Sequence, residues 1–465
     1  EVGESTIDGS NIKLYLTKLN GSEEEPLMTP ETYHEETSEN TYTGRPAGEM
    51  SLYKGSMNSS ENNNYRLRMY VDENYNPQGD GGGLTFSVRI NVYGLAGEKY
   101  VPETTKTILT ANPVQEEKTN MFNYASNGSY ISSFTSSGPT YGNEPSQVTN
   151  GLFEAEDEDG VSYYFRGNVE NNNVQFGQYT KDYYVYRYDD MDFLTLDSCQ
   201  YYNSSCRETN RILKYNAGTP MYWRIVRVNG DGSLRLIYNG TSTSATGQDL
   251  LIGNGVYNQS RNEPKYTGYT YDRDTNEIDS TVKRDIEIWY NEVFVETTYD
   301  NKIINGSFCN DSSGYKLTSE YGIQTYGNPY YIFASHDRLD QANGTTAYGK
   351  PNIPTLKCPT TTESYGGSYR LKVGLITADE LVLSGMVPDM GAYDDSYLTI
   401  KKFNYLSMTP ADFRTSGAYV WRVLATLYPY YVNYNYGIRP VINVATDNGF
   451  APGGDGTAQN PYVIG

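Results

Sequence analysis

The N-terminal part of the chain alternates hydrophobic and polar residues with a period of two. In the first alternating stretch, Ile12, Leu14 and Leu16 fall on one face. This alternation predicts β-strands with one buried face. The three strands predicted in this way are residues 11–16, 65–71 and 84–93. Three strands are too few for a stable sandwich on their own.

We expect the Gly-rich segment 77–83 to join the last two of these strands as a hairpin loop.

The alternating pattern weakens between residues 98 and 150. Residues 103–118 predict one short helix that ends before Pro113. The rest of 98–150 is rich in Ser, Asn and Gly, so we interpret the whole stretch as a linker.

From Gly151 onward the sequence predicts strands that alternate with two helices. The clearest strands are 161–169 and 221–240, and Asn229-Gly230-Asp231-Gly232 predicts a hairpin inside the second of them, because Asn-Gly tolerates positive φ. Together with the N-terminal strands, this pattern predicts a mainly β fold with a few helices (α+β).

Each of the two helices has a sequence signature. Residues 282–294 carry one apolar stripe, formed by Val282, Ile286, Trp289, Tyr290 and Val293. Residues 373–385 predict a short buried strand that runs into a helix. In this second helix Thr377 is the expected N-cap, Glu380 completes a capping box, and Gly385 ends the helix.

Tyrosine dominates the aromatic residues, with 48 tyrosines against 13 phenylalanines and three tryptophans. Tyrosine suits half-buried faces and contact surfaces, although its β-propensity alone explains many of these positions. The densest run occupies residues 428–443 and includes Tyr428, Tyr430, Tyr431, Tyr434 and Tyr436. Two interpretations stay open for this run: a contact face for a glycan, a protein or a neighbouring subunit, and a two-sided strand. Here Gly437 would permit a sharp change of direction, and Pro440 suggests an edge or a bulge.

The net charge of −21 argues against nucleic acid and anionic membranes as partners. No apolar run reaches the roughly 18 residues that a membrane span needs, so we expect no span in this chain. The chain begins at Glu1 without a signal peptide, so we expect a processed mature protein.

The cysteines favour an oxidising, extracellular setting. There are four, at positions 199, 206, 309 and 358, and none belongs to a C-x-x-C pair. Of the three pairings that four cysteines allow, we favour Cys199–Cys206 and Cys309–Cys358.

No motif in the sequence marks catalysis or a cofactor. The two histidines, His34 and His336, lack a neighbouring carboxylate or cysteine motif, and we expect each on the surface. The acidic segments 154–160 and 186–192 depart from EF-hand spacing. Solvated turns are the favoured interpretation of these segments, and weak Ca²⁺ binding is the alternative. We therefore predict no enzyme, no metal site and no required cofactor.

Several stretches of residues 151–465 carry a family resemblance: "SYYFRGNVENNNVQF", "YWRIVRVNGDGSLRLIYNGT", "IEIWYNEV", "SFCNDSSG", "LKCP", "VGLITADELVLSG", "YLSMTP", "YGIRPVINV" and "GDGTAQNPYVIG". In this order they resemble C-type-lectin-like domains, related to formylglycine-generating enzymes, on the surface of Gram-positive (Firmicutes-type) bacteria. Residues 60–97 are similar to the last strands of the β-sandwich that precedes such domains. The resemblance implies a β-sandwich-like region at 1–97, a C-type-lectin-like domain at 151–465, and a place on the bacterial cell surface.

The sequence also departs from these families. The calcium–sugar motif of C-type lectins is broken at Glu144-Pro145-Ser146 and at Glu263-Pro264-Lys265, and no cysteine follows Cys358 where formylglycine-generating enzymes carry their copper-binding pair. An enzyme of that type is therefore the least favoured interpretation.

The leading hypothesis is an extracellular structural or adhesive protein, a subunit of a pilus-like surface filament. Its copies would assemble through residues 1–97, with residues 2–19 as the segment donated to a neighbour. The alternative is a monomeric adhesin that binds a glycan or a protein.

Overall fold

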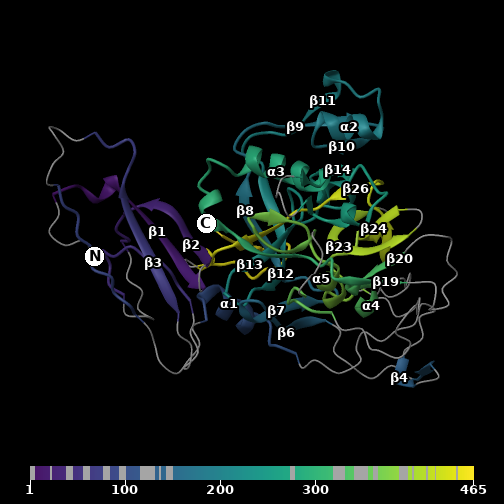
Figure 1. Cartoon of the computed structure of the whole chain (residues 1–465), viewed down its shortest axis with the longest axis horizontal. Coiled ribbons are helices and arrows are strands. Elements are labelled where there is room, and N and C mark those ends of the chain that lie inside the picture. The colour runs from purple at the N-terminus through teal and green to yellow at the C-terminus, as the bar shows by residue number, and fades with distance from the viewer. Residues whose placement is uncertain are drawn as a thin grey trace. The chain divides into compact units, whose positions relative to one another are not determined.

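The computed structural model forms two compact units, residues 1–101 and 102–465 (Figure 1). The described residues are 6–20, 23–37, 45–55, 63–76, 84–93, 101–115, 131–135, 138–142, 150–272, 278–317, 330–339, 354–359, 365–386, 396–400, 403–414, 417–424, 426–446 and 449–464. The predicted loop 77–83 lies outside them. The fold is mainly β with a few helices, as the sequence predicts.

The first unit contains a three-stranded antiparallel sheet in the order β2-β1-β3. Its strands are β1 (Ile12–Asn20), β2 (Glu23–Thr32) and β3 (Asn64–Val71). Ile12, Leu14 and Leu16 are buried, which confirms the alternation predicted for β1. Strand β1 pairs with both β2 and β3 of its own chain, and donation of residues 2–19 to a neighbour stays a prediction.

Strand β3 is an edge of this sheet within the described part of the chain. Its alternating face is largely exposed: Tyr65, Met69 and Val71 keep 39%, 45% and 48% of their surface accessible. A single sheet is described here, so a sandwich for residues 1–97 stays a prediction.

The strand predicted at 84–93 is wrong. The segment is irregular apart from one bridge position at Val88, and Val92 is 93% exposed. It is tied to the chain start instead, where the Thr6 amide donates to the Thr85 carbonyl over 2.8 Å. Alternation produces a strand only where a partner supplies backbone hydrogen bonds, and these residues have no ladder partner among the described ones.

The second unit begins before the segment that resembles a lectin-like domain. Helix α1 (Glu103–Ala111) ends before Pro113, as predicted, and its Ile108 is fully buried in the unit's core. Val114 then pairs with Leu152 in a parallel bridge. The start of the stretch interpreted as a linker is thus packed on the second unit.

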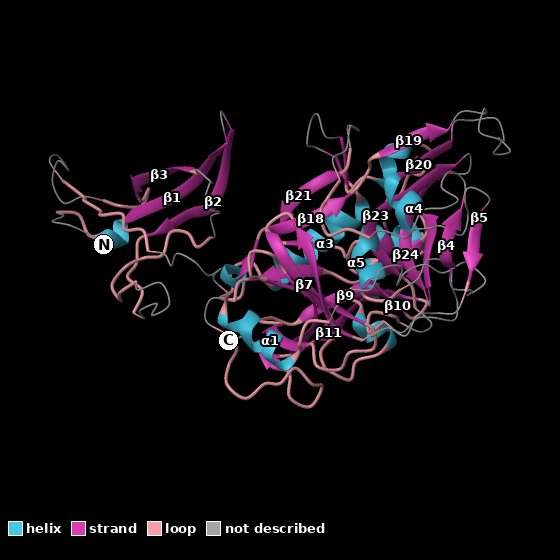
Figure 2. Cartoon of the chain, turned by 90° about the horizontal axis from the view of Figure 1, so that it is seen from below, coloured by secondary structure: helices cyan, strands magenta, loops and turns pink. Residues whose placement is uncertain are grey.

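Two large sheets form most of the second unit (Figure 2). The nine-stranded sheet contains β6 (Gly151–Asp157), β7 (Gly160–Arg166), β8 (Asn173–Gln178), β12 (Pro220–Val228), β13 (Leu234–Tyr238), β17 (Ile303–Ile304), β22 (Val373–Gly374), β27 (Val441–Val444) and β28 (Tyr462–Val463). The ten-stranded sheet contains β9 (Tyr183–Tyr188), β10 (Met191–Phe193), β11 (Arg211–Tyr215), β14 (Gly253–Val256), β19 (Gly314–Leu317), β20 (Tyr330–Phe333), β23 (Tyr405–Arg414), β24 (Gly417–Leu424), β25 (Thr426–Tyr431) and β26 (Asn435–Ile438).

Smaller elements complete the unit. Three two-stranded pairs join β4 (Ile131–Thr135) to β5 (Gly138–Tyr141), β15 (Thr270–Asp272) to β16 (Ile278–Asp279), and β18 (Gly306–Asn310) to β21 (Gly367–Leu371). The remaining α-helices are α2 (Leu196–Tyr202), α3 (Thr281–Val293), α4 (Ala334–Leu339) and α5 (Ala378–Leu383). Helix α3 contacts β14 and β22, and α5 contacts β7 and β23, so both helices touch both large sheets.

The local signatures of this unit are confirmed. The predicted hairpin joins β12 to β13, and its Gly232 amide donates to the Asn229 carbonyl over 2.8 Å. The positive φ, +86°, falls on Gly232, whereas the sequence pattern placed it at Asn229-Gly230. In α5, Thr377 Oγ1 accepts from the Glu380 amide over 3.1 Å, and Glu380 Oε2 accepts from the Thr377 amide over 3.0 Å. Gly385 ends that helix at φ +107°.

Both favoured disulfides are formed. The Cα atoms lie 5.9 Å apart in Cys199–Cys206 and 5.4 Å apart in Cys309–Cys358. The described helices include none with the length and apolar character that a membrane crossing requires.

Candidate functional site

The tyrosine-rich run forms a hairpin strand and the turn that follows it. Strands β24 and β25 pair in antiparallel register, which places Tyr419 opposite Tyr431 and Arg422 opposite Tyr428. The chain then turns through Tyr434 into β26. The five predicted contact tyrosines therefore come from β25, from the turn after it and from β26, which pairs with β14 and β23 rather than with β25.

The structure brings these tyrosines together. Ring centroids are 5.1 Å apart for Tyr430–Tyr434, 5.5 Å for Tyr431–Tyr434 and 6.4 Å for Tyr430–Tyr436. Tyr428 and Tyr434 are 41% and 47% exposed, whereas Tyr436 is buried. Burial raises the pKa of Tyr436 well above its ordinary value. Two of the five rings are thus open to solvent, and one belongs to the core.

Arginines lie against the same rings. The Arg422 guanidinium carbon is 4.9 Å from the Tyr430 ring centroid and 5.9 Å from the centroids of both Tyr428 and Tyr436. The Arg261 guanidinium carbon is 4.4 Å from the Tyr431 centroid. We call Tyr428, Tyr430, Tyr431, Tyr434, Tyr436, Arg261 and Arg422 the tyrosine–arginine surface.

The charge of this surface is not balanced within the described part of the chain. Arg414, which stacks on neighbouring Tyr419, is paired with Asp412 over 2.6 Å. In contrast, neither Arg261 nor Arg422 forms an ion pair with a described carboxylate. Arg422 is only 9% exposed, and its Nε and Nη1 atoms meet no hydrogen-bond acceptor among the described residues. The adjacent aromatic faces compensate a buried cation only in part.

The Gly-x-Arg-Pro sequence after the tyrosines carries the chain from one large sheet to the other. Strand β26 belongs to the ten-stranded sheet and β27 to the nine-stranded sheet, so Pro440 lies between two strands. A Cβ on Gly437 would lie 2.4 Å from Leu251 Cδ1, which explains the glycine by close packing. Arg439 fixes the crossing, because its buried Nε donates to the Tyr238 carbonyl over 2.7 Å.

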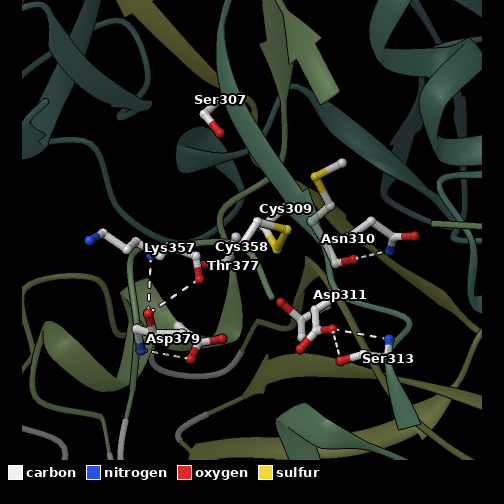
Figure 3. The surroundings of a disulfide bond; sticks show 12 residues. Ser307, Cys309, Asn310, Asp311, Ser313, Lys357, Cys358, Thr377 and Asp379 are labelled. Atoms are coloured by element: carbon white, nitrogen blue, oxygen red, sulfur yellow. Dashed lines mark hydrogen bonds between the residues drawn. A yellow bond between two sulfur atoms is a disulfide. The ribbon is translucent and has the colours of Figure 1, made fainter. Parts of the chain in front are cut away.

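A second group of charges lies beside the Cys309–Cys358 disulfide (Figure 3). It borders a small cavity of about 20 Å³, room for about one water molecule. Arg338 pairs there with Asp379 over 2.8 Å and with Asp311 over 2.6 Å. Because each of these charges faces an opposite one, the group has the character of a structural network.

The acidic segments hold other parts of the chain. In 154–160, Glu156 pairs with Lys357 over 2.5 Å, and Asp159 pairs with Arg370 over 2.7 Å. In 186–192, Asp192 pairs with Arg187 over 2.7 Å. Ion pairing within the protein therefore occupies Glu156, Asp159 and Asp192, whereas Asp189 and Asp190 are exposed in a turn, as the favoured interpretation expects.

The surface position expected for His336 is wrong. His336 is buried in α4, with its Nε2 atom 3.6 Å from Asp412 Oδ2 and its ring 5.6 Å from that of Trp421. The packing of α4 against β23 brings Asp412 close, although it lies far away in the sequence. His34 is exposed, as expected.

Sequence reasoning missed the two arginines. A signal was present for Arg422, because it interrupts the otherwise apolar strand 418–424, "AYVWRVL". A charge at such a position needs a partner or a function. The chain matches none of the protein-family models, curated proteins or solved structures with which it was compared.

Proposed function

We propose that this chain is an extracellular adhesive protein of a bacterial cell surface, and that it binds its ligand at the tyrosine–arginine surface. One observation carries the proposal: the exposed rings of Tyr428 and Tyr434 belong to a cluster of tyrosine rings that packs against Arg422 and Arg261, and neither arginine has a described carboxylate partner. Tyrosine and arginine are, with tryptophan, enriched at binding hot spots, and tyrosine offers a large contact area at low entropic cost. The two disulfides are typical of an extracellular setting.

An array of printed glycans and extracellular-matrix proteins tests this proposal. The intact chain should give a signal that falls at least about tenfold in a Tyr428→Ala/Tyr434→Ala variant, since hot-spot truncations cost about 2 kcal/mol or more. A Tyr184→Ala variant is the control, because this ring is 36% exposed on β9, which β10, β14, β26, β23 and β24 separate from β25 in the sheet. Equal loss in both variants, or no loss in the first, rejects the proposed surface.

The second candidate function is assembly into a filament through the first unit. It is favoured by the edge position of β3 and by its exposed Tyr65, Met69 and Val71. An open edge with an apolar face is a template for another chain. Repeated head-to-tail pairing of this kind gives a contact that need not close into a ring.

The proposal includes no catalytic role. The Ser335 hydroxyl donates to the Pro410 carbonyl and accepts from Trp421 Nε1 over 3.1 Å, so its described bonds are structural. Relationship to C-type-lectin-like domains stays part of the proposal and rests on the sequence stretches given above.

A further inference from the structure

We infer that the ligand of the tyrosine–arginine surface is an acidic saccharide, whose carboxylate is bound by Arg422 together with Arg261. This inference rests on the proposed function, because it names the chemical class bound by the same surface. It follows from an unbalanced buried charge, from a second cation on the adjoining ring, and from the exposed rings at the rim.

Arg422 is nine-tenths buried among three tyrosine rings, and its Nε and Nη1 atoms have no acceptor among the described residues. Both atoms are closed to solvent, so a ligand reaches them when the surrounding rings move aside. Leaving such donors unpaired is costly, and cation–π contacts do not replace hydrogen bonds. A carboxylate fits the planar fork of donors that a guanidinium presents.

Arg261 joins the tyrosine–arginine surface from a different part of the chain. It stacks on Tyr431, whose ring centroid is 5.4 Å from that of Tyr430, the ring that carries Arg422. Adjoining rings therefore carry two cations that pair with no described carboxylate. The chain has 57 acidic residues against 36 basic ones, and in such a chain two neighbouring arginines without a described carboxylate partner are suited to bind an anion.

The net charge of the protein favours a ligand that carries few negative charges. A highly acidic macromolecule would bring many negative charges close to a protein of net charge −21, and their repulsion would oppose binding. A saccharide brings one carboxylate for each acidic ring. The short-range contacts of the arginines then act without large opposing long-range repulsion.

The exposed tyrosines favour a ligand with an apolar ring face beside its anionic group. The Tyr434 ring touches those of Tyr430 and Tyr431, and Tyr428 lies on the other side of Tyr430 in the same strand. Exposed aromatic faces beside a charged group suit a ligand that has an apolar ring face and one anionic substituent.

Isothermal titration calorimetry of the full chain tests the inference with 3′-sialyllactose and trigalacturonic acid as probes. Their neutral counterparts are lactose and galactotriose. At least one acidic probe should bind, and it should bind at least about tenfold more tightly than its neutral counterpart, which is the effect of one charge-assisted hydrogen-bond pair. If neither acidic probe binds, or if both neutral probes bind equally well, the inference is overturned.

Variants locate the charge contact. Arg422→Gln and Arg261→Gln should each weaken binding of the acidic probe by about tenfold or more, and Arg422→Lys should restore only part of the loss, because it lacks the fork. The matched control is Arg211→Gln, since Arg211 stacks on Tyr184 at 4.5 Å in strands distant from this surface. Circular dichroism checks the fold of each variant. If Arg422→Gln does not fold, the more exposed Arg261→Gln still decides, and unchanged affinity in that variant overturns the inference.

Failure of the inference differs from failure of the proposed function. Suppose that a neutral glycan or an acidic peptide binds, and that its affinity falls in Tyr428→Ala/Tyr434→Ala but does not change in Arg422→Gln. This result would support the binding surface and reject the acidic saccharide as its ligand.

Discussion

Arg227 in β12 and Glu380 in α5 form a fully buried ion pair, with 3.1 Å between Nε and Oε1. Arg235 contacts the same carboxylate, and Asp157 contacts Arg227. Glu380 is held in place by the capping box with Thr377, so a local helix signal also orients a charge in the core. Burial by itself raises the pKa of Glu380, but Arg235 and Arg227 more than offset this effect and hold the pKa below its ordinary value.

We expect Glu380→Gln to lower the free energy of unfolding by about 3–5 kcal/mol, because it removes the carboxylate that two buried arginines share and leaves Arg227 with Asp157 alone and Arg235 with no acidic partner in this network. Urea denaturation at neutral pH measures this loss. The control is Glu156→Gln, which breaks the exposed pair with Lys357 and should lower the free energy of unfolding far less, because solvent screens this pair. Equal effects of the two substitutions would show that the buried network does not stabilise the fold.

Asp285 predicts a specific pH dependence. This buried carboxylate accepts hydrogen bonds from Ser198 and Thr195, and burial raises its pKa to about 6, above the ordinary value of 3.8. The folded chain therefore binds this proton more tightly than the unfolded chain, and the stabilisation is complete below pH 3.8 and is lost as the pH rises through 6.

Asp285→Asn should remove this dependence. Relative to the variant, the wild-type chain should lose up to about 3 kcal/mol of unfolding free energy between pH 4 and pH 7. Urea denaturation across this range measures the difference, with the exposed Asp182→Asn as control. Parallel pH profiles for the wild type and Asp285→Asn would contradict the assignment.

The two disulfides should differ in their contribution to stability. Cys309–Cys358 closes a separation of 49 residues and Cys199–Cys206 one of seven. On the loop-entropy model these bonds contribute about 4 and about 2.5 kcal/mol. A Cys309→Ser/Cys358→Ser variant should therefore unfold at lower urea concentration than Cys199→Ser/Cys206→Ser. Peptide mapping without reductant should recover both native pairs, and a crossed pair would defeat the assignment.

Assembly should depend on the exposed face of β3. We expect Met69→Glu/Val71→Glu to abolish polymers while the second unit stays folded, because two charges on this face oppose pairing with another copy. Sedimentation velocity and electron microscopy measure assembly. The control, Leu213→Glu, places one charge at an exposed apolar position of the second unit. Polymers that persist in the β3 variant, or a wild-type chain that stays monomeric at high concentration, would reject the filament.

Local signals in the sequence predicted much of the fold. Thr377 and Glu380 are three residues apart and form their capping box largely without help from the rest of the chain. Gly232 acts within a five-residue turn, and Val282, Ile286 and Trp289 follow the helical period. Each of these features depends on neighbours in sequence, so the sequence alone could predict it.

Features that depend on distant partners were not predictable in this way. Segment 84–93 alternates as well as β1 does, but it has no ladder partner among the described residues. His336 is buried because β23 brings Asp412 to it. Arg261 joins the candidate site from a segment far from β25, and nothing in its own neighbourhood indicates Tyr431. The tyrosines of the candidate site could be predicted because they cluster in the sequence, whereas Arg261 and Arg422 lie outside that run.

The most direct test of the account asks where a bound ligand lies. Tyrosine nitration with tetranitromethane, followed by peptide mass spectrometry, should modify the exposed Tyr428 and Tyr434 in the free chain. With the strongest array ligand bound, nitration of these two residues should fall severalfold, while Tyr184 on β9 stays as reactive as before. Unchanged nitration of Tyr428 and Tyr434 at saturating ligand, or protection confined to other tyrosines, would contradict the claim that this surface is the binding site.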